Sequence, residues 1–102
     1  MLGSFTQIKN NVFIGAGTVI GHDTVINDHC FIGDRVAIAG RVTVGPYCFF
    51  GVGAIVRNRV AIARETVVGA GGLILGDTRE KEVYMGKAAE LLPITSRRLT
   101  IG

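Results

Sequence analysis

The sequence predicts an all-β fold, a parallel β-helix of about four coils built from six-residue repeats. An aliphatic residue or Phe recurs at every sixth position from Ile8 to Ile74, without exception. A second series of mostly small or β-branched residues stands two positions before the first, from Thr6 to Gly72. Gly or Ala directly follows the aliphatic residue in most repeats. A fixed period of six is typical of a β-helix, whose units bury their side chains only when neighbours stack on them.

The spacing within each repeat excludes helical alternatives. An α-helix would place apolar residues three and four positions apart, whereas here the apolar spacings are four and two, with Gly at the bend. Successive side chains of a strand alternate between its faces, so a residue and the one two positions before it point inward together. Each layer of the core therefore pairs a large side chain with a small one, such as Ile20 with Thr18 and Ile32 with Cys30.

Length and composition are those of one small domain. A chain of 102 residues with 48% hydrophobic residues has room for a single core. The mean hydropathy is +0.42, but no uncharged run is long enough to span a bilayer, so we expect no membrane partner. The Lys and Arg residues are scattered with few aromatic residues between them, which predicts no nucleic-acid partner. No basic segment followed by an apolar stretch opens the chain, so we expect a cytoplasmic protein.

Taken in order, the repeats begin at Leu2 and their regularity ends at Asp77. We therefore divide the chain into a β-helix domain, residues 1–78, and a closing strand with a C-terminal tail, residues 79–102. Cys30 and Cys48 are eighteen residues apart in the small inward series, so in a coil of three repeats they stack on each other. We interpret them as buried, reduced thiols. A disulfide between them is the alternative, and thiol titration under denaturing conditions distinguishes the two.

The second coil carries the candidate chemistry, in the dipeptide His22-Asp23. These residues follow the aliphatic residue by two and three positions, which places them at an exposed turn. A histidine is a suitable proton acceptor near neutral pH, and a neighbouring carboxylate can orient it. His29, seven residues later, lies at a different edge and is interpreted as a surface or interface residue.

Three segments resemble the repeat of left-handed β-helix acyltransferases: 14–19 (Ile-Gly-Ala-Gly-Thr-Val), 32–36 (Ile-Gly-Asp-Arg-Val) and 68–72 (Val-Gly-Ala-Gly-Gly). The resemblance covers about three quarters of the chain. It implies that three repeats form one triangular coil, that the coil is left-handed, and that three such prisms associate as a homotrimer. Physical reasoning alone would favour the opposite, right-handed connection.

The catalytic stretch carries a closer resemblance. The segment from His22 to Ile26, followed by Gly-Arg-Val-Thr-Val-Gly at 40–45 and Phe-Phe-Gly at 49–51, is similar to sialic acid O-acetyltransferase-like sugar acyltransferases. These include N-acetyltransferases that act on UDP-linked amino sugars. The resemblance implies transfer from acetyl-CoA to a sugar or nucleotide-sugar acceptor. It assigns His22 as the general base and Asp23 as the acid that activates it.

The same resemblance implies a coenzyme A groove between two adjacent prisms. The matching positions are Phe31, Val52 and Ala70, which would supply van der Waals contacts and backbone hydrogen bonds. Phe31 is equally well interpreted as an aromatic residue of the subunit interface. Gly40, eighteen residues after His22, leaves room for the thioester. A backbone donor from the facing prism would stabilise the tetrahedral oxyanion.

The end of the chain resembles the closing strand of these enzymes less completely. The segment Val83-Tyr84-Met85-Gly86 matches it, but Ala88 stands where Pro is usual and Glu90 where Lys or Arg is usual. A basic contact to the coenzyme phosphates at Glu90 is therefore not expected.

The sequence also bears on two other classes of function. The related β-helix carbonic anhydrases bind zinc through three histidines, whereas this chain has only two, so we predict no metal. The stronger rival is a non-catalytic, trimerising β-helix fragment or scaffold, because the nucleotide-sugar-binding domain that often precedes the β-helix in these enzymes has no counterpart in this sequence. Titration with acetyl-CoA distinguishes that scaffold from an enzyme.

Overall fold

The computed structural model describes residues 1–98, which form an all-β structure with a single short 3₁₀ helix, η1 (Ser96–Arg98). The strands are two residues long and six residues apart up to β12, as the sequence period predicts. Their bounds are β1 Gln7–Ile8, β2 Phe13–Ile14, β3 Val19–Ile20, β4 Val25–Ile26, β5 Phe31–Ile32, β6 Ala37–Ile38, β7 Thr43–Val44, β8 Phe49–Phe50, β9 Ile55–Val56, β10 Ala61–Ile62, β11 Val67–Val68, β12 Leu73–Ile74 and β13 Val83–Tyr84.

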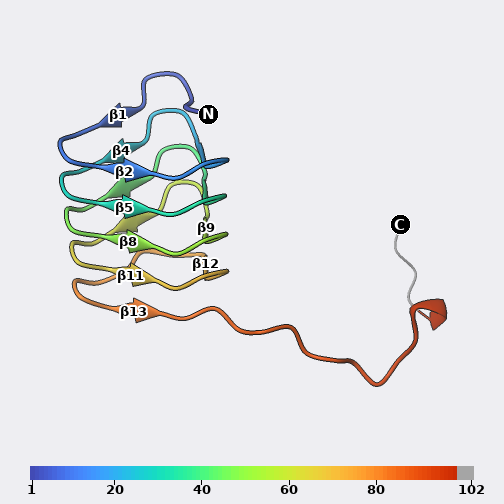
Figure 1. Cartoon of the computed structure of the whole chain (residues 1–102). Coiled ribbons are helices and arrows are strands. Elements are labelled where there is room, and N and C mark those ends of the chain that lie inside the picture. Colours follow the sequence, from blue (N-terminus) through green and yellow to red (C-terminus); the bar gives the residue numbers. More distant parts are fainter. Residues whose placement is uncertain (99–102) are drawn as a thin grey trace.

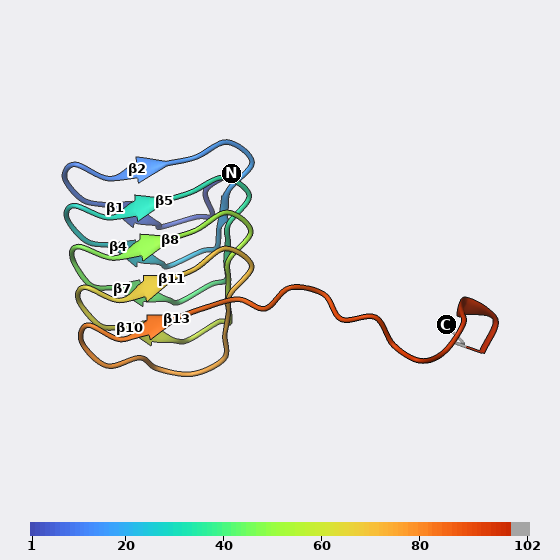
Figure 2. The ribbon, with the colours of Figure 1, turned by 60° about the horizontal axis from the view of Figure 1, so that its bottom comes forward.

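The strands stack into three parallel sheets that form the faces of a triangular prism. Sheet 1 contains β1, β4, β7 and β10, sheet 2 contains β2, β5, β8, β11 and β13, and sheet 3 contains β3, β6, β9 and β12. Every third strand pairs in register, so each residue lies above the one eighteen positions later, as Phe31 lies above Phe49. From the N-terminus the chain winds downward in the left-handed sense through about four coils (Figures 1 and 2).

The second residue of each strand from β1 to β12 is a member of the six-residue aliphatic series, and its side chain points into the prism. From Ile20 to Ile74 these side chains are buried, whereas Ile8 and Ile14 at the N-terminal end are half-buried and pack against the same core. The small residues two positions earlier fill the remaining space, among them Thr24, Cys30 and Cys48. The strand residue between these two positions faces outward.

Sharp turns join the sheets at three corners of the prism. We name them the His22 corner (sheet 3 to sheet 1), the His29 corner (sheet 1 to sheet 2) and the glycine corner (sheet 2 to sheet 3). Each turn contains a residue with positive φ, such as Asp23 at 54° and His29 at 62°. From the second coil onward, the N–H of that residue donates to a carbonyl of the turn above, as Arg41 N–H does to His22 O at 2.8 Å. Turns therefore stack in columns with the same eighteen-residue period as the strands.

The regular coil ends after β12. Residues 75–82 replace the strand that would continue sheet 1, and Thr78 closes this edge by donating its N–H to Ala61 O at 3.0 Å. β13 then pairs with β11 at the end of sheet 2. Beyond β13 the chain leaves the prism as an extended tail (Figures 1 and 2). The last four residues of the predicted tail region, 79–102, lie outside the described residues.

Candidate active site

The predicted pair His22 and Asp23 lies at the His22 corner, on the turn between β3 and β4. The exposed fractions of the two side chains are 56% and 48%, in agreement with the turn position that the repeat predicts. His22 belongs to a column of turn residues that share one position of the repeat: Ser4, His22, Gly40, Asn58 and Gly76. Asp23 belongs to the neighbouring column, which consists of Phe5, Asp23, Arg41, Arg59 and Asp77.

A hydrogen bond fixes the orientation of the His22 ring. The distance between Nδ1 of His22 and Oδ2 of Asp23 is 2.8 Å. An ionised carboxylate only accepts hydrogen bonds, so in the neutral ring the proton is on Nδ1. The lone pair of the neutral imidazole is consequently on Nε2, which is free to accept a proton. This is the arrangement that a general base requires.

Below His22 in the column, Gly40 gives the ring its space. A Cβ atom added at residue 40 would lie 2.7 Å from Nε2, 2.9 Å from Cδ2 and 3.1 Å from Cε1 of His22. The sequence predicts that the missing side chain leaves room for the thioester. In the structure the room beside the Gly40 Cα is occupied by the imidazole itself, so a thioester would have to lie on the outer side of the ring.

The interior of the prism supports this turn. The Thr24 hydroxyl is buried, donates to Ala39 O at 3.1 Å, and accepts the N–H of Val42 at 3.3 Å. His22 O accepts the N–H of Arg41 at 2.8 Å. The backbone on both sides of the imidazole is therefore tied to the coil below it.

Backbone N–H groups at the position of His22 can bind an oxygen anion. At two equivalent positions the N–H donates to an Asp carboxylate one coil below: Asn10 N–H to Asp28 at 2.9 Å, and Ala16 N–H to Asp34 at 2.9 Å. Below His22 the corresponding residue is Gly40, which has no side chain to accept. Within residues 1–98, the N–H groups of His22 and Gly40 donate to no protein acceptor. The site predicted from the sequence does not include these donors, although the eighteen-residue spacing from Asn10 to Asp28 and from Ala16 to Asp34 indicates them.

The remaining predicted contacts lie elsewhere on the prism. Phe31 is on the outer face of sheet 2, where its ring stacks on Phe13 at 4.8 Å and on Phe49 at 5.1 Å. Val52 and Ala70 are on the glycine corner, one above the other. One chain thus brings His22, Asp23 and Gly40 together, and places Phe31, Val52 and Ala70 away from them.

The second histidine has different partners. Asn11 Nδ2 is 2.9 Å from Nδ1 of His29, and the ring of His29 stacks on Tyr47 with 4.8 Å between the centroids. The amide nitrogen of Asn can only donate, so Nδ1 of His29 accepts and its proton is on Nε2.

The two cysteines are free and buried, as predicted. They lie in adjacent coils next to the paired residues Phe31 and Phe49. Each thiol donates to a backbone carbonyl at 3.1 Å, Cys30 to Gly45 O and Cys48 to Ala63 O. The neighbouring Cys30 thiol and burial raise the pKa of the Cys48 thiol above its usual range. Neither cysteine is placed to act as a nucleophile on an external substrate.

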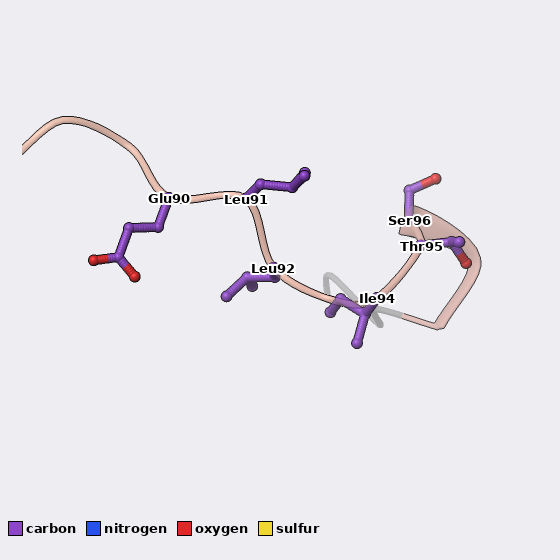
Figure 3. A pocket seen from close by; sticks show the side chains of 6 residues that line it. All are labelled: Glu90, Leu91, Leu92, Ile94, Thr95 and Ser96. Atoms are coloured by element: carbon purple, nitrogen blue, oxygen red, sulfur yellow. The ribbon is translucent and has the colours of Figure 1, made fainter.

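A pocket of about 260 Å³ lies in the tail rather than on the prism (Figure 3). Its walls come from one extended segment, whose lining residues are Glu90, Leu91, Leu92, Ile94, Thr95 and Ser96. It contains no histidine and is remote from the His22 corner, so we do not assign the site to it. Residues 1–98 show no cluster of three metal-ligating side chains. That part of the chain also has no helix with the length and apolar character of a membrane span.

Comparison with solved structures finds acetyltransferases. Serine acetyltransferase 1 from Entamoeba histolytica is 27% identical, with a TM-score of 0.72, over 76% of this chain and 35% of the enzyme. PerB from Caulobacter crescentus, solved with CoA and GDP-perosamine, is 27% identical, with a TM-score of 0.56, over 79% of this chain and 51% of the enzyme. A histidine-to-asparagine mutant of perosamine N-acetyltransferase from the same organism, with the same ligands, is 31% identical, with a TM-score of 0.54, over 84% and 50%.

The chain therefore spans about a third to a half of the length of these enzymes. No curated protein matches the sequence significantly. The family model "Bacterial transferase hexapeptide (six repeats)" matches residues 5–40 and again residues 23–58. The two matches together span more than half of the 102 residues. With its left-handed coil of six-residue repeats, the chain belongs to the bacterial transferase hexapeptide family.

Proposed function

We propose that this chain is the β-helix part of an acetyl-CoA-dependent acetyltransferase that acts on an amino or hydroxyl group of a sugar or nucleotide-linked amino sugar. The observation that carries the proposal is the exposed His22 imidazole, whose Nδ1 is hydrogen-bonded to Asp23 and whose Nε2 has no hydrogen-bond partner among residues 1–98. The acetyltransferases with similar structures support the reaction type, and the complexes of PerB and perosamine N-acetyltransferase with CoA support the acyl donor.

The proposed reaction is a direct transfer. The amino or hydroxyl group attacks the carbonyl carbon of the thioester, and its proton passes to Nε2 of His22. The C–S bond of the tetrahedral intermediate then breaks, and the leaving thiolate takes the proton from the imidazolium, which restores the base. Asp23 holds the ring in the correct tautomer and stabilises its protonated form. No acyl-enzyme forms, which is consistent with the buried positions of Cys30 and Cys48.

The oxyanion of that intermediate needs preorganised donors. The Gly40 N–H is a candidate, because it lies beside the His22 ring and its equivalents at Asn10 and Ala16 bind carboxylate oxygens at 2.9 Å. A backbone donor from a facing prism, as the family resemblance implies, is the second candidate.

The site is proposed to form between two copies. Val52 and Ala70 lie on the glycine corner and His22 on another corner, so a coenzyme that contacts all three must lie in a groove between adjacent prisms. A homotrimer, with Phe31 at or near the groove, supplies such grooves. Arg41 and Arg59 continue the Asp23 column in the C-terminal direction, and their guanidinium groups suit phosphate oxygens of the coenzyme.

A non-catalytic trimerising scaffold is the second candidate function. Such a role would require the prism alone and not the pair His22 and Asp23. In the enzyme proposal, a separate domain holds much of the acceptor. In the scaffold proposal, no ligand occupies the His22 corner.

Calorimetric titration of the purified chain with acetyl-CoA distinguishes the two candidates, with sedimentation analysis to establish the oligomeric state. The enzyme proposal predicts saturable heat with one site per chain, and release of free thiol when a panel of amino sugars is added. A well-folded trimer that gives neither heat nor thiol release would support the scaffold and reject the enzyme.

A further inference from the structure

Gly40 lies against the His22 ring, and a side chain at residue 40 would collide with that ring. Gly40 is not in the left-handed region of φ, so its backbone accepts an L-residue without strain. What a side chain would meet is the imidazole, with three ring atoms between 2.7 and 3.1 Å from the added Cβ. The glycine is therefore required by the ring and not by the turn.

We propose that Gly40 is a positioning residue for His22: the absence of its side chain is what allows the imidazole to lie against residue 40 while its Nδ1 is hydrogen-bonded to Asp23. A methyl group at residue 40 would overlap the ring face. The ring would then rotate away, and the 2.8 Å contact between Nδ1 and Asp23 would be lost. This role is additional to the oxyanion role proposed for the Gly40 N–H, which an Ala at this position would retain.

The chain offers a matched control in the same column. Gly76 has the same position in the repeat and lies at the same corner, two coils below Gly40. A Cβ added at Gly76 meets nothing within 4 Å. Gly40→Ala and Gly76→Ala therefore make the same chemical change at the same position of the repeat, Gly76 in the irregular segment after β12, and only the first one meets an imidazole.

The experiment compares Gly40→Ala, Gly76→Ala and the double variant His22→Ala/Gly40→Ala in the full chain. The primary measurement is the ¹H–¹⁵N spectrum of the histidine side chains, which reports the tautomer and hydrogen bonding of His22 without any substrate. We expect Gly40→Ala to shift the His22 signals away from the Nδ1–H tautomer, and Gly76→Ala to leave them in place. Thermal unfolding is the second measurement. Gly40→Ala should lower the Tm, and the added His22→Ala substitution should restore it.

Activity supplies a third measurement, which rests on the proposed function. A catalytic group displaced by about 1 Å can lose about 10²-fold in rate, so Gly40→Ala should lower kcat by that order while the KM for acetyl-CoA changes little. If the wild-type chain has no activity, the proposed function fails, while the spectra and the double variant still test the positioning role.

Unchanged His22 signals in a folded Gly40→Ala variant would overturn the proposal. If Gly40→Ala does not fold, the double variant decides the question, since it lacks the ring that the methyl group would meet. A double variant that also fails to fold would show that Gly40 serves the backbone and not the imidazole.

Discussion

The His22 corner and the His29 corner are built from turns of the same kind. Each has an exposed histidine whose Nδ1 is hydrogen-bonded to another side chain. At the His22 corner that partner is the carboxylate of Asp23, at 2.8 Å. At the His29 corner it is the amide of Asn11, at 2.9 Å. Carboxylate and amide dictate opposite tautomers, so the proton-accepting nitrogen Nε2 is free at the first corner and already protonated at the second.

The residue one coil below each histidine differs as well. Gly40 leaves the His22 ring uncovered, whereas Tyr47 stacks on the His29 ring at 4.8 Å. One histidine is therefore oriented and accessible, and the other is part of a packed surface ladder. Whether a histidine in this fold can act as a base therefore depends on two kinds of neighbour: the adjacent residue in the sequence, and the residues eighteen positions away, which lie in the coils above and below.

The largest expected difference between the corners is in catalysis. Loss of a general base usually costs about 10²–10⁴-fold in rate. His22→Ala should lower acetyl transfer by that order in an active form of the enzyme, and His29→Ala should leave the rate close to that of the wild type. Release of CoA thiol measures both. Equal losses in the two variants would remove the distinction between the corners.

Exchanging the Nδ1 partners should have the next largest effect. Asp23→Asn keeps the shape of the side chain but favours the wrong tautomer, so we expect a loss at the lower end of the range for a general base, about 10²-fold in kcat. The reverse change, Asn11→Asp, should move the His29 proton to Nδ1 without creating activity, because Tyr47 still covers the ring. Histidine ¹⁵N shifts report both tautomers. If Asp23→Asn retained the Nδ1–H tautomer, the carboxylate would not be what orients His22.

Substitutions of inward-facing residues at the two corners should change the free energy of unfolding by different amounts. This difference should be smaller than the differences in catalysis. Thr24→Val leaves the half-buried Ala39 O and the buried Val42 N–H without their partner. We expect a loss of about 1–3 kcal/mol in the free energy of unfolding, measured with urea. Cys30→Thr is the matched change at the His29 corner and should be nearly neutral, because Thr66 already fills that inward position two coils later. A larger loss for Cys30→Thr would contradict this account.

The smallest effect concerns the stacked pair at the His29 corner. Tyr47→Ala should be less stable than Arg41→Ala by about 0.5–1.5 kcal/mol, the usual contribution of an aromatic pair. Both residues have a φ of 60°, so the backbone cost of Ala is the same in the two variants. Urea unfolding measures the difference. Equal stabilities would mean that the stack on His29 contributes nothing.

The six-residue period was sufficient to predict the fold, because each aliphatic residue from Ile8 to Ile74 occupies the second position of a strand. The handedness was available only through the family resemblance, since the pattern of inward residues is the same for either hand. The exposed turn position of His22 followed from the repeat alone.

The contacts within the site were harder to predict from the sequence than the fold. Residues eighteen positions apart are known to be neighbours once the coil is known, but the direction of a ring is not. The sequence therefore placed Gly40 beside His22 and did not show that the imidazole lies in the space that the glycine leaves. The stack of His29 on Tyr47 and the Asp28 and Asp34 carboxylates bound to backbone N–H groups follow the same spacing, and a search at that spacing would have found them.

The triangular cross-section also limits how the length of this chain can change. Adding or removing eighteen residues shifts everything downstream by one full coil and keeps every corner in line. Adding or removing six residues turns the downstream part by a third of a revolution, which would carry Arg41 and Arg59 out from beneath Asp23. Insertions that preserve the chemistry of an edge should therefore come in multiples of a whole coil, or bulge outward from a single turn.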